Sequence, residues 1–193
     1  MKNKLVAWEI GGFFFMTLVG SALHFTFELS HFSNPVVALF SAVNESIWEH
    51  LKMVFWPGVM FALVEYIFVR RDVNNFLTAK TASLLVMPLV IATGWYLYTA
   101  LTRRNIFQLD MLLYFLAVLT GQAISYRLLT MPPFSRQVNT IAIVGLVVML
   151  IAFSTLTYHP PHISLFEHMD LMDTGQYGIL DSYDGQRYLT DPP

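Results

Sequence analysis

Histidine and glutamate residues gather in two short stretches of this sequence, and the two residue types together can bind a divalent metal. The first stretch carries His24, Glu28 and His31, and the second carries Asn44, Glu45, Glu49 and His50. Neutral imidazole and carboxylate bind Zn²⁺, Fe²⁺ or Mn²⁺. Because the chain contains no cysteine, any metal site must be built from such side chains.

The spacing within each stretch predicts that the polar side chains share a helix face. His24, Glu28 and His31 are separated by four and three residues, which places them on one side of a helix that continues through them. Glu45 and Glu49 are four residues apart and also share a face. Ionisable groups at membrane depth normally face the interior of a helix bundle. We therefore expect the two faces to meet.

A metal at this meeting point would activate water against a lipid-like or amphiphilic substrate. Candidate metal ligands are His24, Glu28, His31, His50 and His162. Glu45 and Glu49 are candidate catalytic general bases. Arg103 and Arg104 are candidates for holding a phosphate or carboxylate of the substrate, and Asn44 is a third substrate-binding candidate.

Two other interpretations stay open, and the sequence does not decide whether the protein is an enzyme. In the first, the protein is a non-enzymatic membrane subunit whose glutamates and histidines form salt bridges or helix caps, or dock another membrane protein. In the second, the polar groups relay protons or ions in a sensor or transporter component, since histidine titrates near neutral pH. No cofactor other than a divalent metal is expected.

The composition is that of a chain dissolved in a lipid bilayer. Of the 193 residues, 55% are hydrophobic and only 12% are charged, whereas soluble domains contain about 25% charged residues. The formal net charge of −2 excludes a strongly basic nucleic-acid-binding protein. The absence of cysteine excludes disulfides and thiol redox motifs.

Five segments are long and apolar enough to cross a bilayer, which takes roughly 20 residues. They run from Leu5 to Phe27, Ile47 to Val69, Thr81 to Thr102, Ile106 to Tyr126 and Gln137 to Tyr158. The predicted fold is therefore all-α, with five transmembrane helices in residues 1–159. Residues 160–193 form an extracytoplasmic tail, either disordered or folded as a small hairpin around Asp184-Gly185.

A short helix that lies at the outer membrane interface, or re-enters the membrane without crossing it, is predicted between the first two spans. Its start is marked by Asn34 as the N-cap and Pro35 in the first turn. The next span begins with a predicted capping box formed by Ser46 and Glu49. On the side of the bundle away from the histidines, we expect an internal ion pair among Glu9, Glu65 and Arg127.

Lysine and arginine near the predicted helix ends favour an orientation with the N-terminus in the cytoplasm and the C-terminus outside. Lys2, Lys4, Arg70, Arg71, Lys80, Arg127 and Arg136 then lie on the inner side. All six histidines of the chain lie in or beside the outer layer. The polar pocket is therefore expected at the outer face.

Three stretches of the chain resemble an uncharacterised family of small bacterial multi-pass membrane proteins. They are "LHFTFELS" from Leu23, "NPVVALFSAVNESIWEHLK" from Asn34, and "PPH" followed by "GQYGI" after the last span. The resemblance implies a protein of the bacterial inner membrane with five spans. It implies no reaction, because the family has no established activity.

Overall fold

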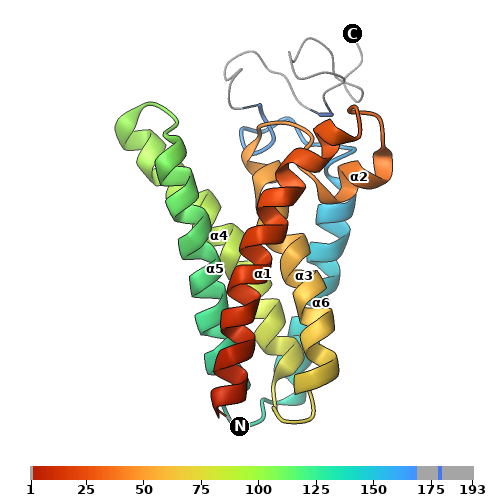
Figure 1. Ribbon diagram of the computed structural model, residues 1–193, viewed down its shortest axis with the longest axis vertical. Coiled ribbons are helices and arrows are strands. Elements are labelled where there is room, and N and C mark those ends of the chain that lie inside the picture. The colour runs from red at the N-terminus through yellow and green to blue at the C-terminus, as the bar shows by residue number, and fades with distance from the viewer. Residues whose placement is uncertain (1, 169–177, 180–193) are drawn as a thin grey trace. The chain divides into compact units, whose positions relative to one another are not determined.

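The computed structural model describes residues 2–168, 178 and 179, and within them every regular secondary-structure element is a helix (Figure 1). The helices are α1 (Lys2–Leu29), α2 (Pro35–Phe40), α3 (Ile47–Val69), α4 (Phe76–Thr102), α5 (Phe107–Leu129) and α6 (Arg136–Thr155). All of them except α2 are long and apolar enough to cross a membrane, which gives five candidate spans. The all-α fold and the short helix between the first two spans are thus confirmed.

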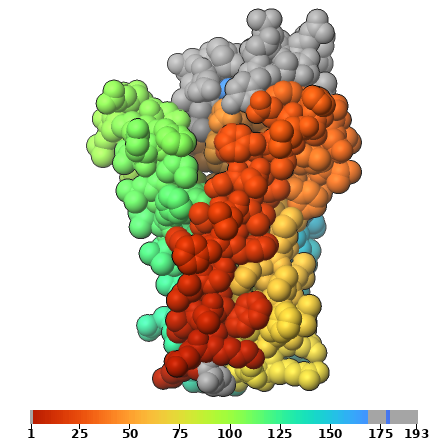
Figure 2. All heavy atoms as spheres, in the orientation of Figure 1, coloured from red at the N-terminus to blue at the C-terminus, as the bar shows by residue number. Residues whose placement is uncertain are grey.

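Exposed apolar side chains cover these helices, as expected for surfaces that face lipid tails. On α1, for example, Ile10, Phe14 and Leu18 are all more than half exposed, and much of this helix is open to view in Figure 2. A surface this apolar would be costly in water. The surface therefore indicates a lipid bilayer environment.

The chain divides into two compact units, and several helices run from one into the other. Unit 1 comprises Met1–Leu18 and Val54–Val148, and unit 2 comprises Val19–Met53 and Met149–Pro193.

Unit 1 is held together by close helix packing and by a buried ionic network. Gly121 of α5 lies so close to α4 that an added Cβ would come within 2.5 Å of the Met87 side chain, the kind of approach that small residues permit in membranes. Lys80 of α4 forms ion pairs with Glu9 and Glu65 at 3.1 and 2.5 Å.

The prediction that Arg127 pairs with Glu9 and Glu65 is therefore wrong. Lys80 is the cation that pairs with both carboxylates, and Arg127 is exposed. Lys80 also explains why the predicted span starts only at Thr81, whereas α4 begins at Phe76. A charged residue lowers the local hydropathy, but a lysine neutralised by two carboxylates fits inside a helix bundle.

Unit 2 is built around the short helix α2. The side chain of Asn34 caps this helix by accepting hydrogen bonds from the backbone N–H groups of Val36 and Val37 at 2.9 and 3.3 Å, and Pro35 occupies its first turn. The predicted cap is thus confirmed. A small core forms from Phe27, Ala38, Val43 and Ile179.

An aromatic stack anchors the first turn of α3 in unit 2. The Trp48 ring lies between Phe153 and Phe166, with ring centroids 4.6 and 4.7 Å away. The backbone N–H of Trp48 also donates to the carbonyl of Leu165 at 2.9 Å. The beginning of α3 is therefore fixed against the segment that follows α6. The hairpin predicted at Asp184-Gly185 lies outside the described residues.

Candidate metal centre

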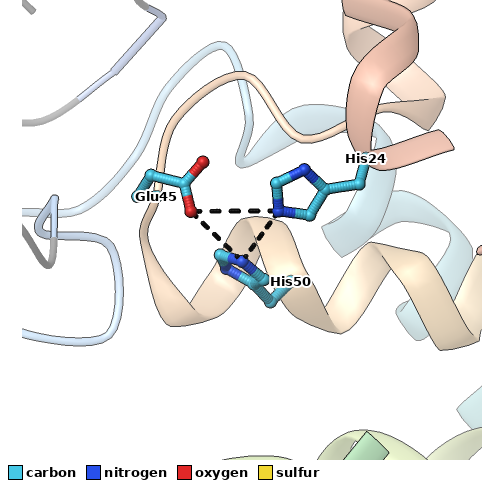
Figure 3. A group of neighbouring side chains, drawn as sticks. All are labelled: His24, Glu45 and His50. Atoms are coloured by element: carbon cyan, nitrogen blue, oxygen red, sulfur yellow. Dashed lines mark hydrogen bonds and ion pairs between the residues drawn. The ribbon is translucent and has the colours of Figure 1, made fainter. Parts of the chain in front are cut away.

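His24, Glu45 and His50 converge in unit 2, although they come from three separate parts of the chain (Figure 3). His24 lies in the last two turns of α1, and His50 lies in the first turn of α3. Glu45 lies in the loop between α2 and α3, so it is not on the helix face predicted to carry it with Glu49. Each of the three side chains is about 30% exposed, which leaves the group accessible from outside.

The three ligand atoms form a triangle of suitable size for a metal ion. The Nε2 atoms of His24 and His50 are 3.3 Å apart, and the Oε2 atom of Glu45 is 3.9 Å from the first and 3.4 Å from the second. One point therefore lies about 2.1 Å from all three atoms, the usual zinc–nitrogen and zinc–oxygen distance.

Two of the three distances match a tetrahedral ion better than an octahedral one. With bonds of about 2.1 Å, neighbouring ligand atoms are about 3.4 Å apart around a tetrahedral centre and about 3.0 Å apart around an octahedral one. The separations of 3.3 and 3.4 Å match the tetrahedral value, and the third, 3.9 Å, is longer than either value. Zn²⁺ prefers this arrangement, whereas Mg²⁺ requires a tighter octahedron of oxygen atoms.

The protonation state of His50 suits metal binding, because its second ring nitrogen is already used. The Nδ1 atom lies 2.8 Å from the backbone carbonyl oxygen of Ser46. A carbonyl oxygen only accepts, so Nδ1 carries the proton and donates it. The Nε2 atom of a neutral ring then presents a lone pair to the other two residues. Such an outer hydrogen bond is the usual way in which proteins orient a histidine ligand.

The electrostatics of the group keep Glu45 ionised. Burial raises the pKa of Glu45, but the hydrogen bond and charge of a protonated His50, together with the charges of protonated His24 and His168, lower it to about 2. Glu45 is therefore a carboxylate while these histidines are protonated. A divalent cation bound in place of those protons would supply the same positive charge beside Glu45.

A buried ion pair holds the loop that carries Glu45. The Glu49 carboxylate lies 2.5 Å from the Lys52 ammonium, and it accepts hydrogen bonds from the backbone N–H of Val43 at 3.1 Å and the hydroxyl of Thr157 at 3.0 Å. Lys52 in turn donates to the carbonyl of Ala38 at 2.8 Å. The pair thus ties α3 to both ends of the segment that leads from α2 to Glu45.

Ser41, which follows α2, connects that segment to the turn of α1 bearing His24. Its hydroxyl donates to the carbonyl of Leu23 and accepts from the backbone N–H of Phe27 at 2.9 Å. The residue is completely buried. The neighbours of all three candidate ligands are therefore fixed by hydrogen bonds within unit 2.

One comparison with known proteins finds a match. The model of a family of unknown function, DUF6512, matches residues 1–179. The chain belongs to the DUF6512 family. The match confirms the resemblance to an uncharacterised family. Neither the curated proteins nor the solved structures contain a significant match to the chain.

The DUF6512 match covers the whole candidate metal centre but assigns it no role. Residues 1–179 contain His24, Glu45 and His50, as well as the ionic network of unit 1. The matched region ends before the predicted hairpin at Asp184-Gly185. Function must therefore be inferred from the geometry itself.

Three other predicted ligands of this DUF6512 member lie outside the convergent group. Helix α1 ends at Leu29, and His31 adopts a left-handed backbone conformation with φ of 55°. The helix therefore does not continue through His31, and the predicted face is interrupted there. Glu28, His31 and His162 are all exposed. Among the described residues, only His24, Glu45 and His50 form a group of metal-binding geometry.

The remaining predicted residues have other positions. Arg103 and Arg104 are exposed and belong to unit 1, where Arg103 ends α4 in a left-handed conformation with φ of 57°. Asn44 is buried and uses its side chain within the protein, accepting from the N–H of Ser46 at 2.8 Å and donating to the carbonyl of Gly178 at 2.6 Å.

The predicted capping box is confirmed in one half only. The N–H of Glu49 donates to the hydroxyl oxygen of Ser46 at 3.3 Å. The second bond of the box, from the N–H of Ser46 to the Glu49 carboxylate, is absent. The side chain of Asn44 accepts from that N–H instead, and the Glu49 carboxylate pairs with Lys52.

Sequence reasoning missed two contributors to the site. The carbonyl of Ser46, four residues before His50, could have been found from the i to i+4 spacing at a helix start. His168 is buried and its charge acts on Glu45, but its position far along the chain gives no local signal.

Proposed function

We propose that this protein is a metal-dependent membrane protein that binds one divalent ion, Zn²⁺ before Fe²⁺ or Mn²⁺, through His24, Glu45 and His50. The observation that carries the proposal is the triangle of 3.3, 3.4 and 3.9 Å formed by two imidazole nitrogens and one carboxylate oxygen. The hydrogen bond of 2.8 Å between His50 Nδ1 and the carbonyl of Ser46, which directs Nε2 toward the other two candidate ligands, supports it further.

Hydrolysis of a lipid-like or amphiphilic substrate is the chemistry that fits such a site best. Three protein ligands leave a tetrahedral ion with one open position, as in catalytic rather than structural zinc sites. A bound Zn²⁺ lowers the pKa of water to about 7 and so supplies a nucleophile at neutral pH. Glu45 then acts as a ligand instead of the general base.

Glu49 also fits a positioning role better than that of a general base in this proposal. Its carboxylate is 2% exposed and is engaged by Lys52, Val43 and Thr157. A catalytic base has to reach the substrate or a water molecule. The partly exposed ligands, in contrast, would be reached from outside.

For its location, we propose the bacterial cytoplasmic membrane, with the N-terminus in the cytoplasm and the metal centre at the outer face. The distribution of lysine and arginine near the helix ends supports this orientation. The substrate would then approach from the outer leaflet or the extracytoplasmic side.

Elemental analysis of the purified full-length protein tests the metal site. We expect about one zinc, iron or manganese per chain in the wild type and in the His31→Ala control, whose histidine is exposed outside the group. The His24→Ala/His50→Ala variant should lose the metal.

A wild-type protein that is purified without chelator, contains no metal and takes up no Zn²⁺ on titration would contradict the proposal. His24, Glu45 and His50 would then be a proton-sharing structural cluster. Retention of metal by the double variant would place the ion elsewhere. Hydrolysis is tested separately, with the metal-loaded wild type on phospholipid and acyl-ester substrates.

A further inference from the structure

A second group of buried ionisable residues lies in unit 1 and is unrelated to the candidate metal centre. Glu9 of α1, Glu65 of α3 and Lys80 of α4 lie together with Ser125 of α5. Their exposed fractions are 6% for Glu9, 0% for Glu65 and 6% for Lys80. Four different spans thus contribute to one polar network.

The Lys80 ammonium contacts one oxygen atom of each of the other three residues. It lies 2.5 Å from Glu65 Oε2, 2.7 Å from Ser125 Oγ and 3.1 Å from Glu9 Oε1. The hydroxyl of Ser125 donates a hydrogen bond to Glu9 Oε1 at 2.7 Å. Both hydrogen bonds to Glu9 thus end on Oε1, and the ammonium lies against Oε2 of Glu65.

The other oxygen atom of each carboxylate lacks a donor. Glu9 Oε2 and Glu65 Oε1 are buried without a hydrogen-bond partner among the described residues. A buried carboxylate oxygen without a donor is costly, and the cost is greatest when the group is ionised. These two oxygen atoms therefore indicate that the carboxylates bind a species whose position the heavy atoms do not show.

The charge balance identifies what is missing. Two carboxylates face a single ammonium, so full ionisation would leave one uncompensated negative charge inside the helix bundle. The other charged residues described in unit 1 are exposed or half-buried and lie near helix ends or in loops: Lys2, Lys4, Arg70, Arg71, Asp72, Arg103, Arg104, Asp110, Arg127 and Arg136. Two carboxylates that share one site do not both ionise readily.

Glu9 gives the network an opening to the surface of unit 1. It lines an apolar groove of about 530 Å³ between α1 and α5, together with Phe13, Gln122 and Tyr126. Glu65, in contrast, is enclosed completely. Glu9 is therefore the carboxylate of the network that lies nearest the surface of unit 1, and the apolar lining of the groove disfavours a hydrated metal ion.

We propose that Glu9 and Glu65 bind one exchangeable proton between them, with Lys80 as the fixed counter-ion. The proton neutralises the excess charge and converts one unpartnered acceptor oxygen into an O–H donor. The network is thus a proton-binding site within the membrane-spanning helices, in addition to the metal centre of unit 2.

Infrared spectroscopy of the full-length protein in lipid tests this proposal. At neutral pH the wild type should show the carbonyl stretch of one protonated carboxylic acid per chain, shifted in D₂O. Glu9→Gln and Glu65→Gln should each abolish that band, because the single remaining carboxylate then pairs with Lys80. Glu28→Gln removes an exposed carboxylate and should leave the band unchanged.

The Lys80→Met variant adds an independent readout. Without the ammonium, both carboxyl groups should be protonated, and the band should grow about twofold. The proposal is overturned if the wild type shows no such band, since both groups would then be ionised beside another cation. It is also overturned if the band persists in both glutamine variants, which would place the proton on another residue.

Discussion

The carboxylate of Glu49 and the ammonium of Lys52 lie 2.5 Å apart in the first turns of α3, and neither side chain is accessible to solvent. The pair is next to His50 in sequence but takes no part in the metal-binding triangle. It holds the backbone of Val43 and Ala38, and so fixes the segment that carries Glu45.

Removal of one partner of this pair should destabilise unit 2 strongly. Lys52→Met leaves the Glu49 carboxylate buried without its cation, which typically costs about 3–5 kcal/mol. The Glu49→Gln/Lys52→Met double variant removes both charges and should lose less stability. Denaturant unfolding of the protein in detergent, followed by circular dichroism, measures both values. A double variant less stable than Lys52→Met would contradict this account.

Glu49→Gln should weaken metal binding although Glu49 is not a ligand. The substitution keeps the shape of the side chain but loses the charge that holds Lys52 and the N–H of Val43, so that the Glu45 loop is held less firmly. Losses of about 10–100-fold in affinity are typical of such outer contacts. Competition with a chelating dye measures the change. Glu28→Gln is the control, and an unchanged affinity in Glu49→Gln would show that the loop needs no such support.

The spacing of the ligand atoms predicts a tetrahedral ion. Co²⁺ bound in place of Zn²⁺ should show the intense visible absorption of a tetrahedral centre, and Glu45→Gln should shift or weaken that absorption because one oxygen ligand changes. The weak spectrum of an octahedral centre would instead require more ligands than the three that converge here.

Metal affinity should fall as the pH decreases below about 6.5, the ordinary pKa of histidine, because only neutral imidazole binds a metal. Glu45, whose pKa the protonated histidines hold at about 2, stays ionised where they titrate and adds nothing to the pH dependence. Titrations with Zn²⁺ between pH 5 and 8, a range set around that pKa, should show proton release on binding. The His31→Ala variant should follow the same curve, and a pH-independent affinity would exclude the two histidines as ligands.

The fold was predictable because it depends on a strong and simple signal. Five apolar segments of about 20 residues need no tertiary information to be recognised. The helix ends were harder, as α4 illustrates. Lys80 looked like the edge of a span until its two carboxylate partners were known, and partners far apart in sequence carry no local pattern.

The candidate site was predictable only as a set of residues that was too large. Helical spacing grouped His24, Glu28 and His31, but the left-handed conformation at His31 ends that grouping. No single residue in this stretch marks the end of α1. Glu45 was included for its presumed place on a helix with Glu49, and it reaches His24 and His50 from a loop instead. Which side chains converge depends on the path of that loop.

That loop has a mechanical consequence. His24 and Glu45 lie on opposite sides of α2 in the chain, so an ion held by both would cross-link the ends of the intervening segment in the way a disulfide would. Such a cross-link restricts the unfolded chain, and the ion adds its own binding free energy to folding, by RT ln(1 + [L]/Kd). In this cysteine-free protein, the metal would thus be the cross-link that stabilises unit 2. Removal of the metal by a chelator would first unfold the segment that contains α2.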